Sequence, residues 1–202
     1  MASREITGLD GSLSTAEPTN RTEPAFGAII TARATKFLAV FRVVLGLEFL
    51  WAFLDKTFGL GYATPAERAW INGGSPTKGF LSRVAVGPLE GTFHAIAGAA
   101  WADWLFMAGL LGIGIALILG IGLRISAVSG TLMMLGMWAA EWPLAKFTSA
   151  GEPSMSTNPI VDYHIIYALA LIALAVTFAG NIWGLGKRWA KLPFVQRNRW
   201  LI

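Results

Sequence analysis

The residues best suited to chemistry lie where long apolar runs of the sequence end. Six of them fall at matching ends of three runs, so parallel membrane helices would bring them to one level: Asp55, Lys56, Glu141, Asp162, Tyr163 and His164. A histidine beside carboxylates can accept and release protons near neutral pH. The catalytic candidates are therefore His164 together with the acids Asp162, Glu141 and Asp55 and the base Lys56.

Such a cluster suits the headgroup of a quinone, because the carbonyls need donors and a quinol needs a proton acceptor. The candidates for contacts with the ring are Trp51, Trp138, Tyr163 and His164. The alternative interpretation is a structural network in which the charges only fix the helix packing. Asp162 fits that interpretation as well, because a carboxylate at the start of a helix is stabilised by the helix dipole.

Cysteine is absent from the 202 residues, and the two histidines are His94 and His164. Disulfide exchange, thiolate catalysis and iron–sulfur clusters are thereby excluded. We expect no metal site, since no ligand spacing calls for one, and no haem. A redox role would depend on a non-covalent cofactor, for which a quinone such as menaquinone is the candidate.

The elements that must position these residues are four apolar runs, at about 37–56, 101–123, 125–142 and 159–183. Each is about as long as a helix that crosses roughly 30 Å of hydrocarbon. None alternates with a period of two, so helices rather than barrel strands are expected. Only 14% of the residues are charged, against roughly a quarter in soluble domains. The sequence predicts an all-α integral membrane four-helix bundle.

The predicted organisation has three parts: a polar tail at 1–35, a membrane domain at 36–186 and a basic tail at 187–202. The first part lacks apolar periodicity and is expected to be disordered by itself. Between spans one and two, residues 57–100 form a segment too long to lack structure. We expect it to be partly helical, with turns near 66–71 and 80–85. Asn158 and Pro159 read as the N-cap and first residue of the fourth helix.

Basic residues indicate the orientation, because lysine and arginine concentrate on the cytoplasmic side. One side carries Arg33, Lys36, Arg124, Lys187, Arg188, Lys191, Arg197 and Arg199. The other is richer in acids. We therefore expect a multi-pass protein of the plasma membrane with both termini in the cytoplasm. The net charge of +4 is spread over span ends, so lipid rather than nucleic acid is the expected contact.

Besides Asp55 and Lys56 at its end, the first run contains two charged residues, Arg42 and Glu48. Glu48 is costly at that depth, and it shares a helical face with Trp51 and Asp55. We expect this face to point into the bundle or to contact a partner protein. The tail 1–35 is a second candidate partner contact, so a larger membrane complex is expected. Arg42 is expected to reach back to the lipid phosphates.

The first run resembles the first helix of the DoxX/DoxD membrane proteins, through Arg42-Val-Val-Leu-Gly46, Phe49 and Asp55-Lys56. The strings GLLGIGIALILGIGLR and NPIVDYHIIYALALIAL are similar to the same family, and GGSPTKGFL resembles its actinobacterial-type members. The resemblance covers about residues 36–190. It implies a four-helix membrane protein and, for the best-known members, the large membrane subunit of a thiosulfate:quinone oxidoreductase. The family's characteristic positions can be carried over to Arg42, Gly46, Lys56, Asn158 and His164 of this sequence. Glu48 departs from the family pattern.

Two functional hypotheses follow. The first is a membrane subunit of a respiratory or other quinone-linked electron-transport assembly, with structural contacts and a quinone site. The alternative is a stand-alone thiosulfate dehydrogenase (quinone) subunit that acts at the outer face. That enzyme needs a basic pocket for its anionic substrate, so Lys56, Lys78 and Arg83 would have to converge. Transport of a solute is disfavoured, because the runs show no inverted repeat or central helix breaker.

Overall fold

The computed structural model describes residues 31–202, of which Ala32–Ile202 form one compact unit. The predicted tail lies outside the described residues up to position 30. Helix α1 begins at Ala32, before the predicted end of that tail at residue 35. No Pro or Gly interrupts the chain between Ala32 and Gly46, so the helix continues into the polar residues before the apolar run.

Three helices are long and apolar enough to cross a membrane: α1 (Ala32–Phe58), α4 (Ala100–Leu119) and α5 (Leu123–Glu141). Helix α6 (Tyr163–Val176) is apolar but shorter. Residues 31–202 contain no strand, only one isolated bridge between Phe147 and Pro153. The all-helical prediction is confirmed, and the membrane prediction holds for these three helices.

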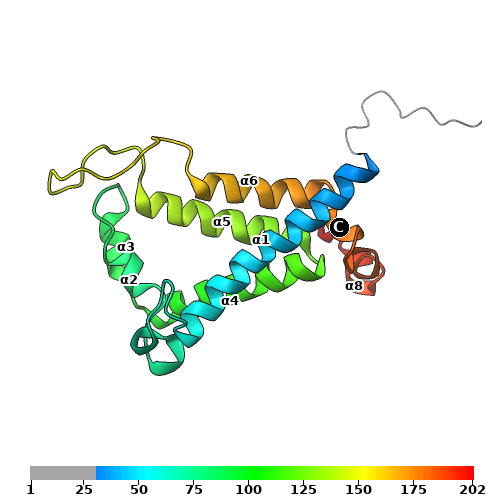
Figure 1. The fold of residues 1–202 in the computed structure, drawn as a ribbon, viewed down its shortest axis with the longest axis horizontal. Coiled ribbons are helices and arrows are strands. Elements are labelled where there is room, and N and C mark those ends of the chain that lie inside the picture. Colours follow the sequence, from blue (N-terminus) through cyan, green and yellow to red (C-terminus); the bar gives the residue numbers. More distant parts are fainter. Residues whose placement is uncertain (1–30) are drawn as a thin grey trace, which may run out of the picture. The chain divides into compact units, whose positions relative to one another are not determined.

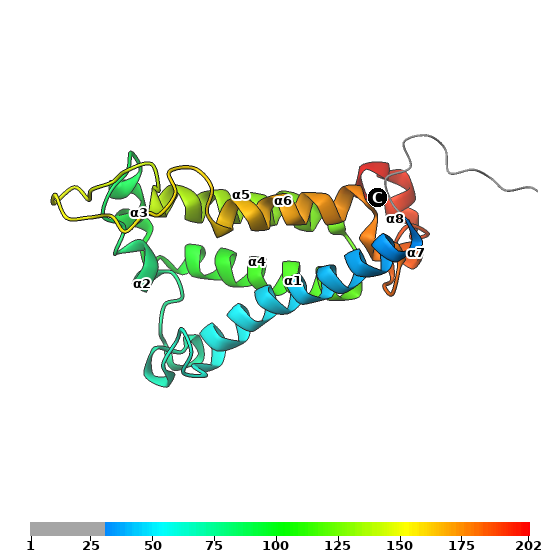
Figure 2. The same ribbon diagram turned by 45° about the horizontal axis from the view of Figure 1, so that its top comes forward.

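The long helices pack as two pairs, which Figures 1 and 2 show from two sides. Helix α1 packs along α4, and α5 packs along α6, while α4 also contacts α5. Apolar side chains of all four helices share one core, which includes Leu45, Phe49, Met107, Leu117, Met134 and Leu171. The outward sides of the same helices expose large apolar side chains such as Val44, Leu132 and Leu169. An apolar core with an apolar exterior is the arrangement expected of helices surrounded by lipid.

Glycine allows α1 and α4 to approach closely. A Cβ atom on Gly114 would lie 2.9 Å from the backbone nitrogen of Leu50, and one on Gly46 would lie 2.9 Å from Cβ of Leu117. Small residues permit this approach between membrane helices. Gly112, on the same helix α4, has nothing within 4 Å of its Cβ position.

Helix α4 ends earlier than predicted because glycines form the turn to α5. Gly120 has φ +71° and Gly122 has φ +56°, a left-handed conformation that glycine adopts without strain. The buried side chain of Arg42 closes the same helix end. Its guanidinium donates to the carbonyl oxygens of Leu117, of Ile118 at 2.9 Å and of Trp183 at 3.0 Å. The expectation that Arg42 reaches lipid phosphates is therefore wrong.

Helix α6 begins later than predicted, because Asp162 rather than Asn158 is its N-cap. The Asp162 carboxylate accepts the backbone N–H groups of His164 and Ile165. Asn158 instead accepts those of Ile160, at 3.0 Å, and Val161, at 2.9 Å. Both residue types form such local hydrogen bonds, so the sequence offers two caps and the fold uses the second for the helix.

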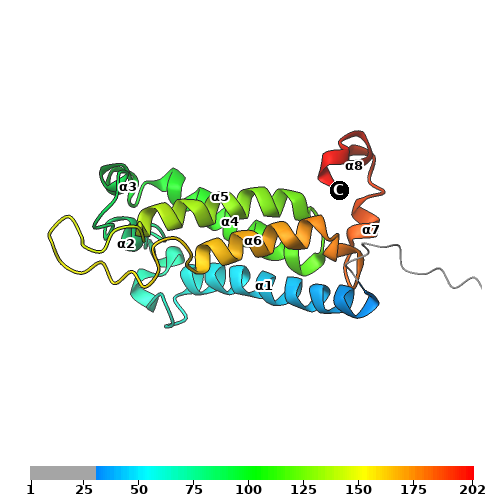
Figure 3. The ribbon, with the colours of Figure 1, turned by 90° about the horizontal axis from the view of Figure 1, so that it is seen from above.

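Short elements occupy both ends of the long helices. The segment between α1 and α4 contains η1 (Ala66–Arg68), η2 (Trp70–Asn72), α2 (Lys78–Leu81) and α3 (Glu90–Ile96), so its predicted partial helicity is confirmed. After α6 come η3 (Ala179–Asn181), α7 (Gly186–Trp189), α8 (Pro193–Arg197) and η4 (Arg199–Leu201). Figure 3 shows the first segment and the α5–α6 loop at one end, and α7 and α8 at the other.

Candidate functional site

A hollow of about 1150 Å³ lies where the α1–α4 segment meets the α5–α6 loop. We call it the outer hollow. Charged side chains from both connections and from the helix ends line it: Lys56, Glu67, Arg68, Lys78, Arg83, Glu141 and Asp162. Tyr163 lines it as well. The hollow therefore joins the predicted site residues of three helices to the long connecting segment.

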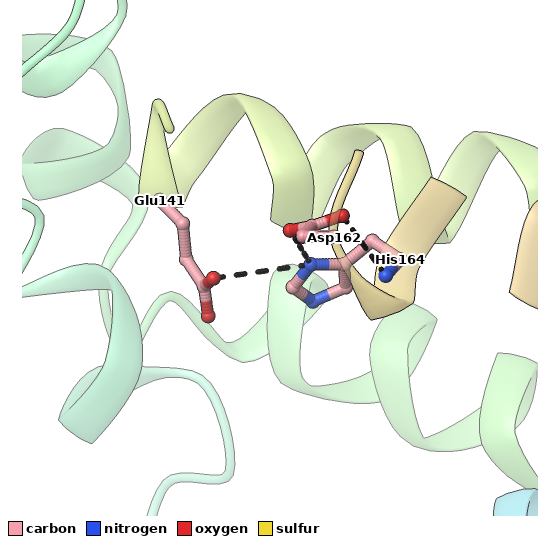
Figure 4. Close-up of side chains that lie close together, drawn as sticks. All are labelled: Glu141, Asp162 and His164. Carbon is pink, nitrogen blue, oxygen red and sulfur yellow. Dashed lines mark hydrogen bonds and ion pairs between the residues drawn. The ribbon is translucent and has the colours of Figure 1, made fainter. Parts of the chain in front are cut away.

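Glu141, Asp162 and His164 form a compact cluster at this end of the bundle, which Figure 4 shows in close-up. Nδ1 of His164 lies 2.8 Å from Oδ2 of Asp162 and 3.9 Å from Oε2 of Glu141. The hydroxyl of Tyr163 donates to Oε1 of Glu141 at 3.0 Å. Helix α5 supplies the glutamate at its last residue, and the start of α6 supplies the other three residues.

Each carboxylate is held through one oxygen, and the other oxygen faces the imidazole. Oδ1 of Asp162 accepts the backbone N–H groups that cap α6, so Oδ2 is left for the ring. Tyr163 holds Oε1 of Glu141 in the same way. Hydrogen bonds of this kind orient a group for its role.

His164 is buried completely, and its two ring nitrogens have different surroundings. Nδ1 faces the carboxylates, whereas Nε2 has no hydrogen-bond partner among the described residues. If Nδ1 carries the proton and donates it to Asp162, Nε2 presents a bare acceptor inside the bundle. The arrangement can therefore accept a hydrogen bond or a proton from a ligand hydroxyl group.

Asp55 does not join this cluster. Its buried carboxylate accepts the backbone N–H groups of Tyr62, at 3.3 Å, and Ala63, at 3.1 Å, so it anchors the chain after α1. Lys56 does line the outer hollow. Of the six residues expected at one level, the hydrogen bonds and ion pairs connect Glu141, Asp162, Tyr163 and His164.

Of the two environments predicted for the face of Glu48, Trp51 and Asp55, the bundle interior is wrong for Glu48 and Trp51, and contact with a partner protein stays a prediction. Asp55 is buried, while Glu48 and Trp51 are exposed on α1. Glu48 lies seven residues before Asp55, or roughly 10 Å along the helix. The folded-back chain at 62–63 covers Asp55 but not Glu48, which therefore does not point into the bundle.

The aromatic candidates have individual contacts. The Tyr163 ring lies 4.0 Å from the His164 ring, measured between centroids. The indole N–H of Trp138 donates to the carbonyl of Ile160 at 2.9 Å. Trp51 packs edge-on against Tyr62 at 5.1 Å. Tyr163 is thus the aromatic candidate that touches the buried histidine.

Four basic side chains share the outer hollow. Lys56, Lys78 and Arg83, the three that a thiosulfate site would need, line it together with Arg68. None of the four forms an ion pair with an acid of residues 31–202. Sequence reasoning did not single out Arg68, and its place beside the Asn72-Gly73-Gly74 turn is the signal that could have indicated it.

Asp103 has a structural role, and sequence reasoning did not single it out either. This buried carboxylate accepts the hydroxyls of Ser75, at 2.9 Å, and Thr77, at 2.6 Å. It also accepts the backbone N–H of Thr77 at 3.0 Å. Asp103 therefore fixes the α1–α4 segment against the first turn of α4 and shapes one wall of the outer hollow.

The comparisons with known proteins return nothing: no family model, no curated protein and no solved structure matches this chain.

Proposed function

We propose that this chain is a DoxX-like membrane subunit of a quinone-linked redox assembly, such as a respiratory chain, and that it holds a quinone headgroup beside His164. The observation that carries the proposal is the unpartnered Nε2 of the buried His164 ring. A buried polar atom without a partner is costly, and a quinol hydroxyl group would supply the missing donor. Tyr163, in contact with the same ring, is the nearest aromatic surface for the ligand.

The proposal places four crossings in the plasma membrane, with both termini in the cytoplasm. Helix α6 is short, but it begins beside Glu141, at the last residue of α5. The chain after it reaches the far end of α4, where the backbone N–H of Leu185 donates to the carbonyl of Leu119 at 2.8 Å. Residues 163–185 thus return along the whole length of the helix pairs, which supports the fourth crossing.

The proposal also assigns the exposed face of α1 around Glu48 to a neighbouring subunit. This face presents Val44, Leu47 and Trp51 with one carboxylate among them. A carboxylate exposed to hydrocarbon costs at least about 2.5 kcal/mol, and contact with a polar or basic group would remove that cost. The tail 1–30, the other expected partner contact, lies outside the described residues.

Retention of quinone in mild detergent tests the site. The wild-type protein should carry extractable quinone. H164Q should bind it about tenfold more weakly, because losing one hydrogen bond costs about 1.4 kcal/mol, which corresponds to a tenfold change in affinity. The matched control is H94Q, because His94 lies elsewhere and bonds to the carbonyl of Val84 at 2.8 Å. Equal retention in H164Q and wild type would contradict the proposal.

The subunit role is tested by the size of the extracted particle. Gentle extraction should bring the chain out with larger membrane subunits that carry redox cofactors. Migration as a lone small particle under every mild condition would count against the assembly.

A second candidate function is oxidation of thiosulfate or a similar sulfur anion at the outer face, with quinone as acceptor. The observation that favours it is the group of four cations in the outer hollow without ion pairs to described acids. Arginine and lysine without carboxylate partners are available to an oxyanion.

Purified protein tests this candidate with thiosulfate and a soluble quinone analogue. R83Q should raise the KM for thiosulfate by about tenfold or more, as expected for a lost charged contact. K146Q is the control, since Lys146 does not line the hollow. A preparation that is inert with thiosulfate excludes this function and leaves the subunit proposal standing.

A further inference from the structure

We infer that Asp162 and Glu141 form a proton path between the buried His164 ring and the outer hollow. The inference deepens the proposed function and rests on it only for the proton donor, a quinol hydroxyl group at Nε2. The path itself consists of residues of this chain and is visible in Figure 4.

Exposure rises step by step along the path. The side chain of His164 is 0% exposed, that of Asp162 is 16% exposed and that of Glu141 is 38% exposed. Both carboxylates line the outer hollow. The ring is thus the buried end of a short series of proton-carrying groups, and Glu141 is the end exposed to solvent.

The two ring nitrogens allow passage of one proton. Nδ1 lies at hydrogen-bond distance from Asp162, and Nε2 lies on the side of the ring away from Asp162. A donor in the bundle would break its O–H bond as an N–H bond forms at Nε2, and the charged ring would release the Nδ1 proton to Asp162. Asp162 lines the hollow, and Glu141, whose Oε2 lies 3.9 Å from Nδ1, is the second carboxylate that can pass the proton to water there. No electrons move in this step, and after it the neutral ring carries the transferred proton on Nε2.

A bound metal ion is the rival occupant of the cluster. The ligand atoms of Glu141, Asp162 and His164 lie within 4.8 Å of one another, close enough for one ion. An ion on Nδ1 would, however, force the ring proton onto Nε2, where no described residue offers an acceptor. A metal-bound histidine normally donates its second N–H, so the geometry favours a proton at Nδ1.

The tautomer of His164 gives the first test. With H94Q, His164 is the single remaining histidine, and its ring ¹⁵N shifts can be recorded on labelled full-length protein in detergent. We expect the proton on Nδ1 and a bare Nε2 at neutral pH. A proton on Nε2 instead, or a stoichiometric complex with added Zn²⁺ that displaces the Nδ1 proton, would overturn the path.

Exchange of the ring proton with water gives the second test. E141Q keeps an acceptor for Tyr163 but cannot carry a proton, so exchange should slow by about a hundredfold, the lower end of the range for a lost general base. The matched control is E67Q, because Glu67 lines the same hollow without contacting the cluster. Unchanged exchange in E141Q would overturn the path.

Neither test uses a quinone, so the two proposals can fail separately. Absence of quinone binding with slowed exchange in E141Q would refute the quinone site and leave the path intact. Quinone binding with equal exchange rates in E141Q and wild type would refute the path alone.

Discussion

At the residue scale, Arg42 illustrates how one buried charge can be satisfied by backbone alone. Its partners are carbonyl groups of the last turn of α4 and of Trp183. Carbonyls at a helix C-terminus lack partners within the helix and carry partial negative charge. The guanidinium therefore joins α1, α4 and the chain after α6 at one point.

The first prediction concerns this residue. R42M should lower the free energy of unfolding by about 2–3 kcal/mol. The variant loses the hydrogen bonds donated by the charged guanidinium and leaves the carbonyl groups without a partner. Thermal unfolding in detergent is the measurement. R33M, at an exposed position of the same helix, should behave as wild type, and equal loss in both variants would show that Arg42 has no special role.

The sequence could predict that a polar cluster forms around His164, but it could not predict which of the six candidate residues belong to it. Glu141, Asp162 and His164 meet because the apolar runs that they flank end at one level, which hydropathy alone reveals. Asp55 was expected at that level too, yet its oxygens accept hydrogen bonds from the backbone of residues 62–63. The path of that loop depends on packing, and no local pattern encodes it.

At the element scale, the helices were more predictable in their middles than at their ends. Apolar length located α1, α4 and α5. The start of α6 was misplaced because Asn158 and Asp162 both satisfy the chemistry of an N-cap. The end of α4 was misplaced because Gly120 and Gly122 could equally belong to a helix face, and only their positive φ angles place them in the turn.

The second prediction concerns the α1–α4 contact. G114V should destabilise the protein by about 1–3 kcal/mol, because the new side chain would collide with Leu50 of α1 and overpacking of that kind has this cost. G112V is the matched control on the same helix, since nothing lies within 4 Å of its Cβ position. Resistance to heat and protease in detergent should separate the two variants. Equal behaviour would refute the close helix contact.

At the scale of the whole molecule, the positions of the charged residues along the chain bear on the orientation in the membrane. Residues 163–202 contain no acid and five lysines and arginines, whereas the outer hollow is lined by side chains of both signs, the acids Glu67, Glu141 and Asp162 and four bases. Figure 3 shows α7 and α8, which belong to this basic segment, at the end of the long helices opposite to α2 and α3. A terminal segment whose charges are all basic is typical of the cytoplasmic side of a membrane protein, and it supports the orientation proposed above.

The third prediction tests the membrane arrangement on which the site depends. Because the chain has no cysteine, single cysteines can be introduced by E152C, in the α5–α6 loop, and by K191C, after α7. A membrane-impermeant maleimide added to intact cells should label E152C at once and K191C only after permeabilisation. Labelling of K191C in intact cells, or protection of E152C, would contradict an outer hollow that opens away from the cytoplasm.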